Sequence, residues 1–109
     1  MQQIDDTTYK SALAKNSSPY MLYFSAPWCG PCRLFRPTIS QASVGRVKDV
    51  TIFSINVDNC PEMLNEYKVA SVPTTLGFSE GAEVFRLSGA KDARSLNTSI
   101  DSLLTGVKS

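Results

Sequence analysis

Two of the three cysteines stand close together in the segment Trp28-Cys29-Gly30-Pro31-Cys32, with two residues between them. Thiols at this spacing support three kinds of chemistry. They can close a structural disulfide, hold a metal ion with help from other ligands, or alternate between a dithiol and a disulfide. Each possibility makes a different demand on the rest of the chain.

A structural disulfide between Cys29 and Cys32 would contribute little to stability. It would close a loop of four residues. Loop-closure entropy then gives about 2 kcal/mol, against about 5 kcal/mol for a 100-residue loop. Structural disulfides are also rare in reducing compartments. The polar, acidic start of the chain contains no pattern typical of a secretory signal peptide, which favours such a compartment.

A structural zinc site would need four ligands, usually two cysteine pairs or one pair with histidines. The chain contains no histidine, and its third cysteine, Cys60, stands apart from the pair. Only a site shared between two chains would complete the ligand set. The metal interpretation is therefore kept as an alternative.

A dithiol that cycles with a disulfide fits the segment best. Pro31 suits the first turn of a helix, which places Cys29 at or just before that turn. The unpaired N–H groups and the positive end of the helix dipole there favour a thiolate. Cys32 lies one turn on and is expected to be less exposed, so Cys29 attacks and Cys32 resolves. Gly30 leaves the approach to Cys29 open, and Pro31 stiffens the turn.

The composition indicates an ordinary small globular protein. The chain has 109 residues, 42% of them hydrophobic, and a formal net charge of +1. We therefore expect a single domain over residues 1–109, with no nucleic-acid partner. The apolar runs fall short of the roughly 20 residues that a membrane helix needs. We expect a soluble, cytoplasmic protein without a membrane partner.

The hydrophobic pattern predicts alternating helices and strands. In chain order the expected elements are a helix capped by residues 5–8 and broken at 17–19, a strand over 20–24, a helix from about 29, a strand over 50–57, a short helix after 61, a hairpin of strands 74–78 and 82–87, and a helix after 92 with the stripe Leu96, Ile100, Leu103 and Leu104. This order indicates an α/β fold, with a partly parallel sheet covered by helices on both faces.

At this point the chain resembles a known family. The sequence WCGPC after an apolar strand is similar to the active site of thioredoxins and is highly specific for them. Residues 56–62 (NVDNCPE) and 71–75 (SVPTT) resemble two further motifs of the family, and Gly81 and Gly89 keep its spacing. The resemblance covers nearly the whole chain. It implies a thioredoxin fold, with a central mixed β-sheet flanked by helices, and a protein-disulfide reductase.

The resemblance also implies a substrate groove beside Cys29. Pro73 should follow a cis peptide bond and lie against the cysteines. The backbone of Val72 should pair with an extended segment of the substrate. The expected groove residues are Trp28, Gly30, Pro31, Val72, Pro73, Gly89 and Ala90.

The resemblance further implies partners rather than cofactors. The protein should bind no cofactor and receive electrons from a thioredoxin reductase or a similar flavoprotein. Its substrates should be disulfide-containing proteins, and it should act as a monomer. Two alternatives stay open. The chain could be a binding subunit of another enzyme whose dithiol is incidental, or a dedicated reductant of one enzyme such as a ribonucleotide reductase.

Several positions depart from the family pattern, among them Gly77, which interrupts a strand that is normally aliphatic. Tyr23 stands where thioredoxins usually bury an aspartate, and Ser54 stands where they often place a lysine. The joint loss of both charges is coherent, because one unpaired buried charge costs about 3–5 kcal/mol. Cys60 is expected to be a half-buried residue without a function, with a regulatory thiol or a dimer cross-link as the alternatives.

Overall fold

The computed structural model describes residues 1–16, 19–46 and 49–105, except for the side chains of residues 43, 45 and 46. Its elements are β1 (Gln2–Ile4), α1 (Tyr9–Lys15), β2 (Tyr20–Ser25), α2 (Gly30–Arg46), β3 (Thr51–Asn56), the 3-10 turn η1 (Val57–Asn59), α3 (Pro61–Glu66), β4 (Thr74–Ser79), β5 (Ala82–Ser88) and α4 (Ala93–Thr105). Part of the helix break expected at 17–19 lies outside the described residues. No described helix has the length and apolar character needed to cross a membrane.

The described strands form one mixed sheet in the order β1-β3-β2-β4-β5. β3 is parallel to both β1 and β2, whereas β4 is antiparallel to β2 and to β5. The expected α/β fold is therefore confirmed. The periodicity did not predict β1, because three residues are too few to show alternation and the strand depends on its pairing with β3.

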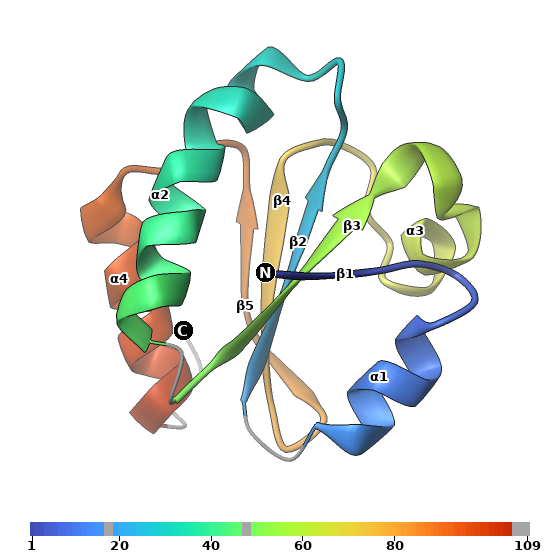
Figure 1. Ribbon diagram of the computed structural model, residues 1–109. Helices are drawn as coiled ribbons and strands as arrows, with labels where there is room; N and C mark the ends of the chain where they lie inside the picture. Colours follow the sequence, from blue (N-terminus) through green and yellow to red (C-terminus); the bar gives the residue numbers. More distant parts are fainter. Residues whose placement is uncertain (17–18, 47–48, 106–109) are drawn as a thin grey trace.

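The sheet is covered on both faces, which explains the apolar run at residues 20–24. Figure 1 shows α2 and α4 on one face and α1 and α3 on the other. Met21 and Tyr23 belong to the core beneath α2 and α4. Leu22 and Phe24 belong to the core on the opposite face, and all four side chains are fully buried. Strands buried on both faces read as continuous apolar segments.

The last helix begins and packs largely as its sequence predicts. Asp92 caps it, since its Oδ1 accepts a hydrogen bond of 2.8 Å from the Ser95 N–H. Leu96, Ile100 and Leu103 are buried against the sheet. The inclusion of Leu104 in this stripe was wrong, because its side chain is exposed. It lies about 100° around the helix from Leu103, away from the sheet.

Two hydrogen bonds hold the loop that precedes β4. The Val72–Pro73 peptide bond is cis, as expected. The Thr74 hydroxyl donates a bond of 2.7 Å to the Ser71 carbonyl, and the Gly89 N–H donates one of 2.8 Å to the Pro73 carbonyl. The end of β5 and the start of β4 thus fix the loop at the edge of the cysteine pair.

Gly77 interrupts β4 because the space beside it is already filled. It pairs with Phe85 across the hairpin. A Cβ atom at position 77 would collide with the Phe85 ring. The glycine that looks out of place in an aliphatic strand therefore accommodates an aromatic side chain on the neighbouring strand.

The buried hydroxyl of Thr75 leads to a stability prediction. Its side chain is fully buried, and its hydroxyl has no hydrogen-bond partner among the described residues. Thr75→Val is expected to raise the free energy of unfolding by about 1 kcal/mol, because it removes a desolvated hydroxyl and keeps the shape. Denaturant titration monitored by circular dichroism measures the change.

The matched control is the same substitution at the neighbouring threonine. Thr74→Val removes the bond to the Ser71 carbonyl and is expected to lower stability by about 1–3 kcal/mol. Equal destabilisation by both variants would show that the Thr75 hydroxyl has a partner.

Candidate active site

Cys29 and Cys32 lie at the connection between β2 and α2, and their sulfurs are joined in a disulfide. Their Cα atoms are 5.2 Å apart. α2 begins at Gly30, so Cys29 precedes the first helical residue as expected. The two side chains are 4% and 3% exposed. The expected difference in their exposure is therefore absent, because both pack with Ala26 against Val57 and Val72.

The start of α2 is directed at the Cys29 sulfur. The backbone N–H of Cys32 donates a hydrogen bond of 3.2 Å to Cys29 Sγ. The intervening Pro31 has no N–H to offer, so the sulfur takes the place of an N-cap oxygen. An N–H donor and the positive end of the dipole both favour negative charge here. In the reduced protein this arrangement favours a Cys29 thiolate.

A shallow apolar hollow adjoins the cysteines on one side. Its volume is about 230 Å³, and its lining consists of Trp28, Val57, Leu64, Val69, Ala70, Ser71 and Val72. Trp28 is 65% exposed, and its indole N–H donates a bond of 2.9 Å to Asp58. That bond aligns the ring with η1. The 56–62 motif, which contains Asp58, was the sequence signal that could have predicted this contact.

The structure brings only some of the predicted groove residues together. Trp28 and Val72 line the hollow, whereas Gly30, Pro31, Pro73, Gly89 and Ala90 are not part of its lining. Pro73 and Gly89 are joined by the backbone hydrogen bond described above. The prediction missed five lining residues, because only the folded chain places η1, α3 and the loop after α3 beside Trp28. They are Val57, Leu64, Val69, Ala70 and Ser71.

Tyr23 lies directly behind Cys32. Its fully buried hydroxyl donates a hydrogen bond of 3.1 Å to the Cys32 carbonyl, and its ring packs edge-on against Phe35. Burial raises the pKa of Tyr23, with smaller opposing effects from the Ser25 hydroxyl and the Arg36 charge. The phenol is therefore neutral near pH 7 and a poor acceptor for the Cys32 proton. Ser54 faces Tyr23 in the β2–β3 register.

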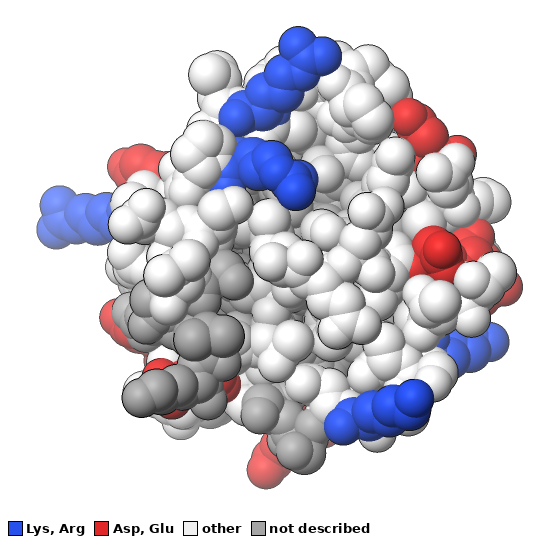
Figure 2. Space-filling view, viewed as in Figure 1, with Lys and Arg blue, Asp and Glu red and all other residues white. Residues whose placement is uncertain are grey.

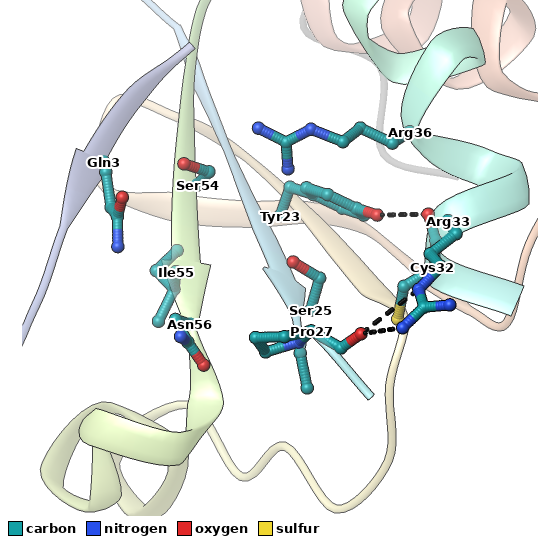
Figure 3. A pocket seen from close by; sticks show the side chains of 11 residues that line it. Gln3, Tyr23, Ser25, Pro27, Cys32, Arg33, Arg36, Ser54, Ile55 and Asn56 are labelled. Carbon is teal, nitrogen blue, oxygen red and sulfur yellow. Dashed lines mark hydrogen bonds between the residues drawn. The ribbon is translucent and has the colours of Figure 1, made fainter. Parts of the chain in front are cut away.

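A second hollow of about 290 Å³ opens on this side of the cysteine pair. Its lining residues come from β1, β2, β3 and α2, and are Gln3, Tyr23, Ser25, Ala26, Pro27, Cys32, Arg33, Arg36, Ser54, Ile55 and Asn56. Figure 3 shows this lining from close by. Its charged members are both arginines. The sequence analysis missed them, although position 36 lies one helical turn beyond Cys32.

Cys60 is more buried than expected. Its side chain is 1% exposed and packs among apolar residues of the core beneath α1 and α3. Burial also raises the pKa of its thiol. Both effects reduce thiol reactivity, which supports a packing role.

The described residues hold no group of three or more histidine, cysteine, aspartate or glutamate side chains that could bind a metal ion. The cysteine pair has no further ligand near it within this part of the chain. A zinc site would therefore need ligands from a second chain.

Comparison with known proteins agrees with the resemblance seen in the sequence. The thioredoxin family model matches residues 1–102. The thioredoxin of Mycobacterium tuberculosis is 31% identical over 94 residues, which cover 86% of this chain and 81% of that protein. Thioredoxin 1 of Synechococcus elongatus is 31% identical over 98 residues, covering 90% and 92% of the two chains.

A chloroplast protein is also among the relatives. The chloroplastic M-type thioredoxin of Spinacia oleracea is 30% identical over 105 residues, which cover 96% of this chain. The matched region spans only 58% of the spinach protein.

The buried position of Tyr23 leads to a stability prediction. Tyr23→Phe removes the hydroxyl and its bond to the Cys32 carbonyl, and is expected to lower the free energy of unfolding by about 1 kcal/mol. Tyr23→Asp also removes the ring and buries a carboxyl group, so we expect a loss of about 3 kcal/mol. Adding Ser54→Lys to Tyr23→Asp should recover part of that loss by pairing the charge.

Urea titrations of the wild type and the three variants at pH 7 measure these differences. A Tyr23→Asp protein as stable as Tyr23→Phe would mean that the carboxyl group at position 23 reaches water, which contradicts the placement of this side chain.

Proposed function

The chain belongs to the thioredoxin family, and from that premise we propose that it reduces protein disulfides by dithiol–disulfide exchange. The observation that carries the proposal is the hydrogen bond from the Cys32 N–H to Cys29 Sγ at the start of α2. It supports Cys29 as the thiolate, because no comparable donor to the Cys32 sulfur is found among the described residues.

The reaction proceeds in two exchanges. The Cys29 thiolate attacks one sulfur of the substrate disulfide, and the other substrate sulfur leaves as a thiolate. Cys32 then attacks the Cys29 sulfur and displaces the second substrate sulfur. The protein ends with the Cys29–Cys32 disulfide that the structure contains. Two electrons pass to the substrate, and a reductant must return them.

Substrate binding is assigned to the apolar hollow beside Trp28. An extended peptide would pair with the backbone of Val72 and cover the exposed Trp28 ring. Gly30, Pro31, Pro73 and Gly89 would border this path. Contact through backbone groups and a shallow apolar surface suits many substrate sequences, because few side-chain pockets discriminate among them.

The source of electrons and the location complete the proposal. The protein is proposed to act as a monomer without a bound cofactor, reduced by a thioredoxin reductase or a similar flavoprotein. A cytoplasmic location would keep the dithiol reduced between turnovers. The spinach relative is named as chloroplastic, so the location of this chain is not given by its family.

The cysteine roles predict opposite phenotypes for two serine variants. In insulin reduction coupled to a reductase, Cys29→Ser is expected to lose activity, because no activated thiolate remains. Cys32→Ser should still attack but stop at the mixed disulfide, which mass spectrometry detects as a covalent adduct. Retained turnover by Cys29→Ser, or no adduct with Cys32→Ser, would reverse or refute the roles.

Cys60→Ser is the matched control, since it makes the same chemical change at a buried thiol outside the site. It is expected to keep wild-type activity. The binding-subunit alternative is tested by a different readout. If the dithiol is incidental, alanine at both Cys29 and Cys32 should leave the biological role of the protein intact.

The neutral phenol behind Cys32 predicts a slow second exchange. Tyr23→Asp supplies a carboxylate at that position and is expected to resolve a preformed mixed disulfide faster than the wild type. The first attack by Cys29 should change little, since α2 activates it. Stopped-flow measurement of both steps tests this, and equal resolving rates would exclude proton transfer as the slow event.

A further inference from the structure

The hollow behind Cys32 has the character of an anion site. It is lined by Cys32 itself, by hydroxyl and amide side chains, and by two arginines. No aspartate or glutamate belongs to its lining. Figure 2 shows two basic side chains close together near the start of α2, with no acidic side chain between them on this face. The charge of the lining is therefore entirely positive.

The two arginines differ in their hydrogen bonding. Arg33 is held, since its Nε and Nη2 donate bonds of 3.2 and 2.8 Å to the Pro27 carbonyl. Arg36 makes no hydrogen bond or ion pair with any residue that the structure describes. Figure 3 shows its guanidinium extending across the hollow, over the Tyr23 ring and toward Ser54. A guanidinium in this position presents several free N–H donors to the space beside it.

Hydroxyl groups supply the floor of the hollow. Tyr23 is fully buried and Ser54 is 8% exposed. The Ser54 hydroxyl makes no hydrogen bond within the described part of the chain. Ser25 pairs with Asn56 in the sheet and lies further along the hollow in Figure 3, nearer to Cys32. The Tyr23 hydroxyl already donates its proton to the Cys32 carbonyl. The Ser54 hydroxyl and the Arg36 guanidinium are therefore the donors that match the acceptor oxygens of a tetrahedral oxyanion.

The chemistry at Cys32 gives such an anion a task. A cysteine thiol has an ordinary pKa of about 8.5, so Cys32 must lose a proton as it attacks. The chain has no histidine, the lining has no carboxylate, and the buried phenol of Tyr23 stays protonated. A phosphate group, whose second pKa lies near 6, is a better matched acceptor near neutral pH.

We propose that the hollow behind Cys32 binds a phosphate-type dianion through Arg36 and that this anion accepts the Cys32 proton during the resolving step. The proposal rests on the exchange reaction proposed above. In that step the Cys32 and Cys29 sulfurs form a bond. The bond between Cys29 and the substrate sulfur breaks, and its electron pair leaves on the substrate thiolate. The Cys32 proton passes to the bound dianion, which becomes a monoanion.

The test follows the resolving step alone. A mixed disulfide is preformed between Cys29 and thionitrobenzoate, and release of the coloured thiolate is timed at pH 7 and constant ionic strength. Inorganic phosphate is expected to accelerate release saturably, by about 100-fold for a well-placed acceptor. Sulfate has the same shape and charge but is not basic. It is expected to occupy the site and to suppress the phosphate effect.

Two variants locate the effect. Arg36→Gln is expected to lose the saturable acceleration. Lys10→Gln removes the same charge from α1 on the opposite face of the sheet, and should keep it. Acceleration that stays linear in phosphate, or that Arg36→Gln retains, would overturn the site, as would sulfate acting as well as phosphate. Failure of Cys29 to form the mixed disulfide would instead count against the proposed function.

Discussion

The hydrogen bond from the Cys32 N–H to the Cys29 sulfur depends on where α2 begins. β2 ends at Ser25, and a short turn leads from it to α2, which starts at Gly30. Pro31 then stands in the first turn of the helix. A start one turn earlier would bury Cys29 in the helix and remove its unpaired donors. The remaining elements keep this end of the helix at the edge of the sheet. β2 holds its position because its side chains are buried on both faces of the sheet.

The burial of β2 also determines what can lie behind the cysteines. Tyr23 alternates with Leu22 and Phe24, so its side chain must point to the α2 face. There it meets Phe35 and the Cys32 carbonyl. A neutral aromatic group in this place avoids the desolvation of a charge. The site therefore combines an N–H donor to the Cys29 sulfur with a neutral phenol behind Cys32.

The two hollows beside the cysteine pair differ in polarity and charge. The one beside Trp28 is apolar and borders the loop that contains the cis Val72–Pro73 bond. The one behind Cys32 is polar and positively charged. An extended substrate and a small anion can thus approach the same disulfide from different sides.

The sequence by itself determined the elements and the reacting pair. Local spacing carries that information, as in the WCGPC segment, the apolar run of β2 and the stripe from Leu96 to Leu103. The tertiary structure alone decided the equal burial of the two cysteines, the exposure of Leu104 and the meeting of Trp28 with Asp58. It also decided the convergence of Arg36, Tyr23 and Ser54 on one hollow. These are contacts between elements far apart in the chain, and local periodicity reports which face a residue takes but not what it meets there.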